Sequence, residues 1–540
     1  MKERRAGLAT WLVVAAGLAL WVRWSPLAAN DLVAGDEGYY GTMARNILAD
    51  PHQLASPSLW PLGPPGDKPP LYPALLAGSV RLLGPTEPAL RWPTVLAAGM
   101  VALALAALVA RALGGWWGMA TAALLMTLPR LADAARSAAT EIPLTALGCL
   151  AMVALARERV TRARAAAAGA LLGAAFLCKL WFALAFALPA LAMLWPWRGE
   201  RLRAAAMLAA TAALVGGLQL AAVALFRAPD LPHWWDVYWG FSFARRLGGG
   251  GYAGSWIQPP AFYWASLLHA FVALLPLVAL GLEEAVRRAR EPVPRALLVW
   301  ALCIVPLSLF RVKSAVYANL LVPGWGALAV FGAHALASGR RPWGPGVGLF
   351  ALASFPPLAR AIAGESLPLP LWLAVWSGWL AVAAIVSARP PAARRVAIAL
   401  LIGAAGIGLY RTAQRLPLRY HDVGYRAIAA AIAPILRDAD PSRPSFIAPE
   451  APAFGYYLFK AGRYWGTPYA PWSAAQRAAV AADASLRVFI VDAKRELYGG
   501  WPDSTMLGWL ERSTREVTPE IERAAGRPLA VRVFVRPGPG

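Results

Sequence analysis

Long apolar segments recur along the 540-residue chain, and short clusters of arginine separate them. A helix needs about twenty apolar residues to cross a bilayer, with a tolerated range of about seventeen to twenty-five. With 59% hydrophobic and 15% charged residues, the chain is also too apolar for a soluble globular protein of this length. We therefore predict a polytopic α-helical membrane protein.

Thirteen segments have the length and hydropathy of membrane spans. The stretch 71–83 is apolar but short and contains Arg81, so we expect it to lie along the membrane interface. The N-terminal run after KERR is expected to be an uncleaved first helix. The thirteen predicted spans are 7–24, 91–110, 115–131, 142–156, 165–179, 181–197, 204–226, 260–282, 295–310, 315–337, 344–362, 369–387 and 395–411.

The arginine clusters predict the orientation of the chain. With a cytoplasmic N-terminus, nearly every dense cluster falls in a cytoplasmic connection, among them 157–164, 198–203 and 287–295. Counting 71–83 as a span would place most of these clusters outside, against the positive-inside rule. The segments expected to face outward are the first loop at 25–90, the turn near Glu141, the loop at 227–259 and the tail after 411.

The tail differs in composition from the rest of the chain. Residues 412–540 gain Asp, Glu, Pro and Ser, and they contain β-like runs at 487–493 and 529–536 between helical patterns. We predict two domains, a membrane domain over 1–411 and a small extracytoplasmic α/β domain over 412–540.

Charge and cysteine usage exclude two classes of protein. The net charge of +23 arises from clusters between apolar runs and not from a continuous basic stripe, so we expect no nucleic-acid partner. The three cysteines lie inside apolar runs, and the five histidines show no metal-ligand spacing, so no dedicated metal site is predicted. A metal held by Asp36, Glu141 and scattered groups stays open.

Two adjacent carboxylates, Asp36 and Glu37, follow the first apolar segment. Neighbouring residues point about 100° apart on a helix, so the two cannot form a glycosidase-type pair, and one of them is expected to act alone. The apolar residues that follow have helical spacing, which predicts a short helix on the membrane surface with Asp36 near its N-terminus. A carboxylate in that position suits a base, and it also suits an ordinary helix cap.

The order of motifs around this pair resembles the GT-C glycosyltransferases that use polyprenyl-phosphate sugars. Related families are the lipid A aminoarabinose transferases and the bacterial protein O-mannosyltransferase-like proteins. The resemblance continues to residue 330 and beyond it only in layout. It implies a GT-C fold of about 13 transmembrane helices with a small C-terminal α/β extracytoplasmic domain. The residues that carry it are Asp36-Glu37, Lys68-Pro69-Pro70-Leu71, Gly84, Glu87, Arg91 and Pro93, with the stretches 136–155, 169–179 and 311–330.

The resemblance implies an inverting transfer in which Asp36 is the general base and Lys68 lies near the donor phosphate. Glu37 and Glu141 are the candidates for a second carboxylate or an acceptor contact. Relatives often have Asp at the position of Glu141, and an acid there suits orienting a basic side chain. Lys179 is expected at the outer end of its span, within reach of phosphate.

Other basic residues of the outer loops are candidates for binding the donor phosphate, because paired arginines offer bidentate contacts. Anchoring in the lipid headgroups is the alternative reading for these residues. The candidates are Arg245 and Arg246, beside a glycine run at 248–251, together with Arg311, Lys313 and Tyr317.

Topology further predicts that the donor is a lipid, since the acidic loop faces away from cytosolic nucleotides and no nucleotide-binding motif is present. The expected acceptor is a glycolipid such as lipid A, a polysaccharide or a protein. The expected setting is a bacterial inner membrane, with the site facing the periplasm or exterior and the protein a monomer. The alternatives are a membrane transporter or lipid flippase, and a non-catalytic relative that only binds lipid.

Overall fold

The structure is a computed structural model. It describes residues 2–338 apart from gaps at 25–26, 28–31, 33–35, 59–67, 249–256 and 272–273. It also describes residues 424–537 apart from 441–442, 450, 459, 461, 465–472, 493–503, 527 and 530, and the isolated residues 399, 403 and 406. The predicted spans 344–362, 369–387 and 395–411 lie outside the described residues, except for 399, 403 and 406.

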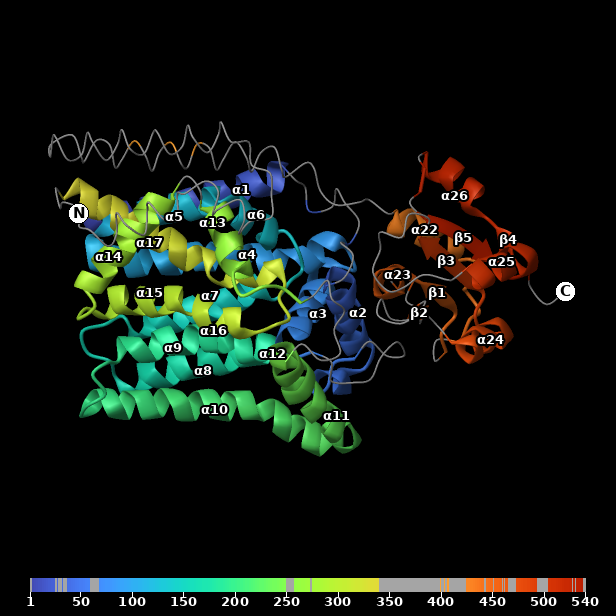
Figure 1. The fold of residues 1–540 in the computed structure, drawn as a ribbon, viewed down its shortest axis with the longest axis horizontal. Helices are drawn as coiled ribbons and strands as arrows, with labels where there is room; N and C mark the ends of the chain where they lie inside the picture. The colour runs from blue at the N-terminus through green and yellow to red at the C-terminus, as the bar shows by residue number, and fades with distance from the viewer. Residues whose placement is uncertain are drawn as a thin grey trace.

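The N-terminal part of the chain is a helical bundle (Figure 1). Its helices are α1 (Lys2–Trp24), α2 (Asp36–Ala49), α3 (Leu71–Leu83), α4 (Glu87–Leu113), α5 (Gly115–Thr127), α6 (Pro129–Ala135), α7 (Glu141–Leu155), α8 (Arg162–Lys179), α9 (Leu184–Met193), α10 (Glu200–Phe226), α11 (Leu231–Trp235), α12 (Arg246–Gly248), α13 (Phe262–Ala270), α14 (Leu275–Arg287), α15 (Pro292–Leu302), α16 (Ile304–Leu309) and α17 (Val322–Ala337). Shorter 3-10 turns are η1 (Pro51–Leu54), η2 (Leu180–Ala183), η3 (Ala228–Asp230) and η6 (Ala315–Leu320), and η4 (Asp236–Arg245) is a π-helix.

Several of these helices have the composition of membrane spans. Among the described residues, four helical stretches are long and apolar enough to cross a bilayer: Glu87–Leu113, Arg162–Met193, Glu200–Phe226 and Pro292–Leu309. Shorter apolar helices cover Ala6–Val22, Leu71–Leu83, Glu141–Leu155 and Val322–Ala337. The stretch Arg162–Met193 contains α8 and α9, which η2 separates at Leu180, a residue with a φ of +50°.

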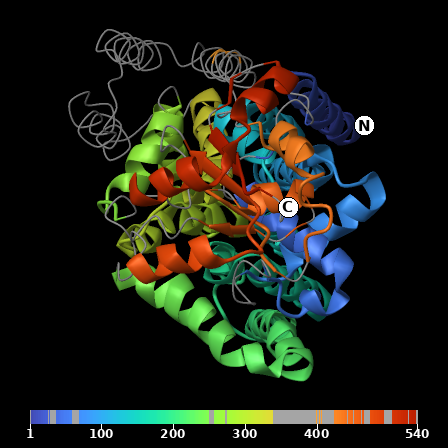
Figure 2. The same ribbon diagram turned by 90° about the vertical axis from the view of Figure 1, so that its right-hand side faces the viewer.

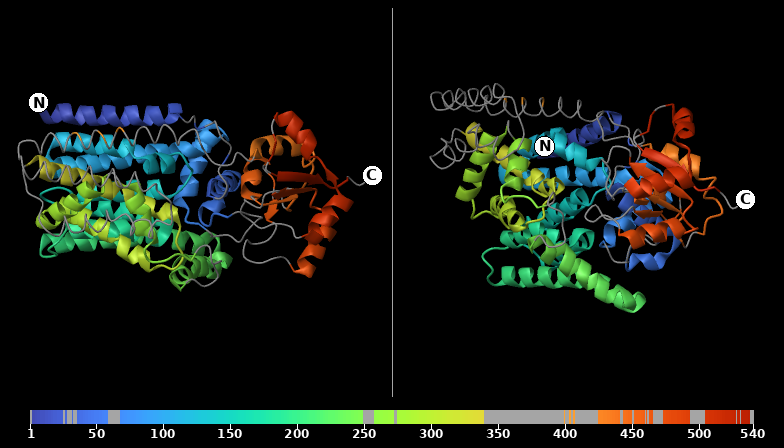
Figure 3. Two further views of the ribbon diagram at one scale, coloured as in Figure 1. Left: turned by 45° about the horizontal axis from the view of Figure 1, so that its top comes forward. Right: turned by 45° about the vertical axis from the view of Figure 1, so that its right-hand side comes forward.

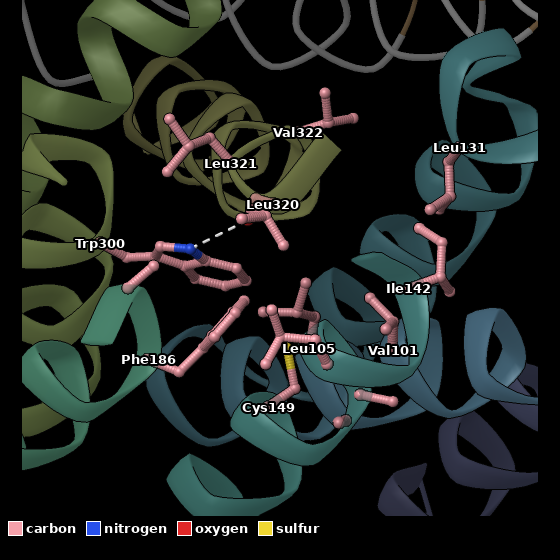
Figure 4. Close-up of a cluster of buried hydrophobic side chains, with 14 of the residues drawn as sticks. Val101, Leu105, Leu131, Ile142, Cys149, Phe186, Trp300, Leu320, Leu321 and Val322 are labelled. Atoms are coloured by element: carbon pink, nitrogen blue, oxygen red, sulfur yellow. Dashed lines mark hydrogen bonds between the residues drawn. The ribbon is translucent and has the colours of Figure 1, made fainter. Parts of the chain in front are cut away.

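One large hydrophobic core joins most of the described helices of the bundle, and a smaller cluster contains Leu180, Val223, Trp234, Val237 and Tyr238. In the close-up of Figure 4, residues of α4, α7, α9, α15 and the start of α17 meet around Trp300. The Trp300 indole is buried, packs against Phe186 with ring centroids 5.3 Å apart, and donates a hydrogen bond to the Leu320 carbonyl at 3.1 Å. That bond satisfies the indole N–H, which usually has a hydrogen-bond partner when a Trp is buried.

One end of the bundle carries α2, α3, α11 and the C-terminal sheet. Figures 1 and 3 show α2 and α3 across this end, between the bundle and the C-terminal sheet, and Figure 1 shows α11 at the same end. The N-terminus lies at the opposite end (Figure 1). The predicted interfacial segment 71–83 forms α3, which lies across the end of the bundle.

The C-terminal part contains a five-stranded sheet with strand order β2-β1-β3-β5-β4. β1 (Phe446–Ala448) pairs in parallel with β2 (Gly462–Tyr464) and β3 (Val488–Asp492), and β5 (Val531–Val535) runs antiparallel to β3 and to β4 (Arg515–Glu516). The strands β3 and β5 fall within the β-like runs predicted at 487–493 and 529–536.

Helices cover both faces of this sheet, which lies in front of the bundle when seen from this end (Figure 2). Alternate strand residues point to opposite faces, so Phe446 packs in one buried cluster and Ile447 in the other. The first cluster includes α22 (Tyr425–Ile432), α23 (Ala451–Leu458) and α26 (Thr518–Ala525), and the second includes α24 (Ala474–Ala482) and α25 (Ser504–Ser513).

Candidate active site

The two adjacent carboxylates open α2, and they lie in different environments. The Asp36 side chain is exposed and forms no hydrogen bond or ion pair with another described residue. Glu37 is 1% exposed, and its carboxylate accepts hydrogen bonds from Arg91 Nε at 3.0 Å and Nη2 at 2.8 Å. Asp36 is therefore available to a substrate, whereas Glu37 is fully occupied within the protein.

Glu37 also connects α2 to the loop before α7. Its Oε1 accepts a hydrogen bond from the Ala138 backbone N–H at 2.9 Å, and Arg91 Nη1 donates to the Leu27 carbonyl at 2.5 Å. A buried carboxylate is stable only when its charge is paired and its oxygens are hydrogen-bonded, and both conditions hold here. The pair fixes the start of α2 against α4 and against the segment that leads to Glu141.

Glu141 is the first residue of α7 and forms an ion pair with Lys179, the last residue of α8. The Glu141 side chain is 2% exposed and the Lys179 side chain 15%. This contact holds the Lys179 ammonium beside the Glu141 carboxylate. It also leaves the ammonium partly accessible at the end of its helix.

Two further residues extend this cluster. Lys179 Nζ lies 5.0 Å from the centre of the Tyr317 ring, and the Tyr317 hydroxyl accepts a hydrogen bond from Arg246 Nη1 at 2.5 Å. Tyr317 lies in η6 and Arg246 begins α12, so four separate elements contribute to one group of side chains. We call Glu141, Lys179, Tyr317 and Arg246 the basic cluster, since its two cations outnumber its one carboxylate.

Asp36 lies close enough to this cluster to interact with it electrostatically. Its carboxylate acts on Lys179 and on Tyr40, one turn further along α2. Burial raises the pKa of the Tyr40 hydroxyl well above its ordinary value, and the negative charges of Asp36 and Glu141 raise it further. The Tyr40 hydroxyl therefore stays protonated within electrostatic range of the two carboxylates, and Asp36 is within the same range of the partly exposed Lys179.

Lys68 lies against the same helix. Its ammonium is 5.5 Å from the centre of the Tyr39 ring, a separation within the range of cation–π attraction. Tyr39 is three residues after Asp36, so the motif Lys68-Pro69-Pro70 reaches the first turn of α2.

The side chains of the remaining basic candidates form other contacts, although the Arg311 backbone N–H donates to the Arg246 carbonyl at 3.0 Å. Arg245 forms an exposed ion pair with Asp236 at 3.0 Å within η4. Arg311 donates to the Gly248 carbonyl at 3.3 Å, and Lys313 is 3% exposed and donates to the Gln258 carbonyl at 2.9 Å. Of the arginine pair, the structure thus brings only Arg246 to Tyr317.

Sequence reasoning missed two partners. Arg91 belongs to the motif that carried the resemblance, but nothing in the motif indicated that it pairs with Glu37, 54 residues away. Lys179 was placed at the outer end of its span, without Glu141 as its partner. The motif therefore indicated that Arg91 is important, but not which residue it pairs with. For Lys179, the available signal was that Glu141 is predicted at the same outer end of the bundle.

Among the described residues, no group of three or more His, Cys, Asp or Glu side chains is arranged to hold a metal ion. The cysteines Cys149, Cys178 and Cys303 are buried and free.

The fold is similar to that of the GT-C glycosyltransferases. A family model described as dolichyl-phosphate-mannose-protein mannosyltransferase matches residues 67–226, from the loop before Lys68 to the end of α10. No curated protein sequence matches the chain.

Solved structures with the same fold extend the similarity over the whole chain. ArnT from Cupriavidus metallidurans, bound to undecaprenyl phosphate, is 19% identical with a TM-score of 0.66, and the match covers 98% of each chain. The Archaeoglobus fulgidus oligosaccharyltransferase AglB, in complex with an inhibitory peptide and a dolichol-phosphate, is 13% identical with a TM-score of 0.56 over 89% of this chain and 69% of that one. The arabinofuranosyltransferase AftD from Mycobacteria is 14% identical with a TM-score of 0.56, over 99% of this chain and 40% of that one. The predicted resemblance to polyprenyl-phosphate-dependent GT-C proteins is confirmed at the level of the fold.

Proposed function

We propose that the protein is a membrane glycosyltransferase that moves a sugar from a polyprenyl-phosphate donor to an extracytoplasmic acceptor. One observation carries this proposal: Asp36 is exposed, has no ion-pair or hydrogen-bond partner among the described residues, and lies within electrostatic range of Lys179 at the end of α8. The similar structures of ArnT and AglB were solved with undecaprenyl phosphate and dolichol-phosphate, which are ligands of this chemistry.

In the proposed reaction, the Asp36 carboxylate takes the proton of the acceptor hydroxyl as the oxygen attacks the anomeric carbon of the donor sugar. The new bond joins that carbon to the acceptor oxygen, and the bond to the lipid phosphate breaks with its electron pair on the phosphate. A single displacement inverts the anomeric configuration. The proton leaves on Asp36, and the departing phosphate carries the negative charge.

That charge needs fixed cations, and several are close. Lys179 and Arg246 meet at Tyr317, and Lys68 lies over Tyr39 near the start of α2. Cations held in place before the reaction stabilise a developing negative charge without reorganisation. We propose that these three residues bind the leaving phosphate. Arg245, Arg311 and Lys313 stay candidates for guiding the donor phosphate into the site.

The position of the cluster favours transfer over transport. A secondary transporter holds its substrate near the bilayer midplane, between broken helices. Here Glu141 begins α7 and Lys179 ends α8, so the charges lie at the ends of helices, near the surface helix α2.

We further propose a bacterial inner-membrane location with the site facing the periplasm or exterior. The membrane domain would extend over 1–411 and the extracytoplasmic domain over 412–540. The acceptor would be a glycolipid such as lipid A, a polysaccharide or a protein, and the protein a monomer.

The test is a mass-spectrometric comparison of envelope glycolipids, polysaccharides and glycoproteins from cells with and without the protein. We expect at least one glycan species to lose a single sugar when the protein is absent, and the same species to return when the gene is restored. An envelope unchanged in every glycan class would count against glycosyl transfer.

A further inference from the structure

The C-terminal part of the chain packs directly on the helix that carries Asp36. Gly38 lies so close to α23 that a Cβ atom there would come within 2.8 Å of the Ala453 backbone nitrogen. Thr42 Oγ1 donates a hydrogen bond to the Pro452 carbonyl at 2.8 Å, and Arg45 donates one to the Gly455 carbonyl. Successive turns of α2 therefore contact α23.

A second contact joins α22 and α23 to the first residue of α4. The Glu87 carboxylate is largely buried, and its Oε1 accepts hydrogen bonds from Arg426 Nη2 at 2.6 Å and from the Tyr457 hydroxyl at 2.6 Å. The Tyr457 hydroxyl in turn accepts a bond from the Leu32 backbone N–H at 3.1 Å, just before α2. We call Glu87, Arg426 and Tyr457 the Glu87 cluster.

The first turn of α4 thus holds α2 in two ways. Arg91 binds Glu37 directly, and Glu87, four residues earlier, binds the segment that packs on another face of α2. Tyr456 completes this contact, since its ring is 2% exposed within the core of the bundle and its hydroxyl donates to the Thr86 carbonyl at 3.3 Å.

We propose that Arg426 and Tyr457 are positioning residues for the transfer reaction: by binding Glu87 they hold α23 on α2 and so set the place of Asp36. The inference rests on the proposed function in naming Asp36 as the base. A displacement of about 1 Å at a catalytic group can cost about 10²-fold in rate, so a contact outside the site is enough to control turnover.

The test compares the double variant Arg426→Gln/Tyr457→Phe with Arg426→Lys and with a matched control, all in lipid nanodiscs. Arg426 is 52% exposed and Tyr457 half-buried, but the buried Glu87 loses both partners, so thermal unfolding is measured first to check that the double variant stays folded. The control is Arg532→Gln, which removes the Arg–Glu pair with Glu516 at 2.6 Å inside the sheet, away from α2.

Hydrogen–deuterium exchange gives a readout that needs no activity. We expect the double variant to exchange faster in both 451–458 and 36–49, and Arg532→Gln to change neither. Faster exchange in 451–458 with no change in 36–49 would overturn the inference, because α23 would then not hold α2. No change in either segment would overturn it as well, because the Glu87 cluster would then not hold α23.

Turnover gives the second readout. With undecaprenyl phosphate as the binding probe, we expect the affinity to stay within about twofold, while the transfer rate falls at least about tenfold and Arg426→Lys restores most of it. Unchanged turnover in the double variant would overturn the positioning role. If the unmodified protein transfers no sugar, the proposed function fails, and the exchange result still decides whether α23 holds α2.

Discussion

At the scale of single residues, the adjacent carboxylates Asp36 and Glu37 lie in different environments, although both belong to α2. Because neighbouring positions on α2 point in different directions, Glu37 faces Arg91 and Asp36 faces outward. The buried pair gives rigidity, and the exposed carboxylate is left without a partner among the described residues. Glu141 and Lys179 are arranged similarly, because a buried carboxylate there fixes the position of a partly exposed ammonium.

The buried pair should be costly to break. We expect Arg91→Leu to lower the free energy of unfolding by about 3–5 kcal/mol, because Glu37 would remain charged and buried without its partner. Thermal unfolding in detergent measures the change. The matched control is Arg203→Gln in the exposed pair with Glu200, where both side chains are more than 60% exposed (64% and 71%) and no measurable change is expected. Equal effects of the two variants would contradict the structural role of Glu37.

At the scale of elements, close helix packing depends on glycine at a few positions. α14 and α17 meet where Gly281 faces the Leu328 carbonyl and Gly332 faces the Leu277 carbonyl. A Cβ atom would come within 1.8 Å of the first oxygen and 2.0 Å of the second, and backbone atoms cannot move aside as a side chain can. Small residues at this contact let the two backbones approach.

We expect Gly281→Ala to destabilise the protein by about 1–3 kcal/mol or more, since the added methyl group forces α14 and α17 apart. Gly217→Ala is the matched control: it lies in α10 with open space around it, and alanine there should be neutral or stabilise by up to about 1 kcal/mol. Thermal unfolding of both variants is the measurement. A Gly281→Ala protein as stable as the parent would show that the helices are not packed this closely.

The periodicity of the sequence predicted individual helices and strands well. It predicted contacts between segments far apart in the sequence poorly. The helix at Asp36 and the strands β3 and β5 were predicted because each has its own periodicity. The predicted span 260–282 is instead two helices, α13 and α14, and 315–337 begins with the 3-10 turn η6. The bond from Thr42 to Pro452 joins residues 410 positions apart, and no local signal reports such a contact.

At the scale of the whole molecule, the charge pattern and the fold agree about which segments share an end. α2, α11 and the C-terminal sheet lie at one end of the bundle, opposite the N-terminus and its basic residues (Figure 1). The described elements of the first loop, of the loop at 227–259 and of the tail therefore lie at the same end. We propose that the opposite, N-terminal end faces the cytoplasm, as the positive-inside rule predicts.

This orientation is testable with single added cysteines, because the three native ones are buried. We expect Ser513→Cys, exposed in the sheet domain, to react with a membrane-impermeant maleimide in intact spheroplasts. Glu158→Cys, exposed in an arginine-rich connection, should react only after the membrane is permeabilised. The opposite labelling pattern would place the site on the cytosolic side and exclude the proposed acceptors.

The central claim is that Asp36 takes the proton of the acceptor, and transfer by an Asp36→Asn protein tests it most directly. Asp50→Asn is the control, since Asp50 lies in the same loop and only caps η1, a role that asparagine fills equally well. We predict that Asp36→Asn lowers the transfer rate by about 10²–10⁴-fold, with undecaprenyl phosphate binding and thermal stability unchanged, while Asp50→Asn keeps its activity. Transfer by Asp36→Asn at the rate of the unmodified protein would contradict the account.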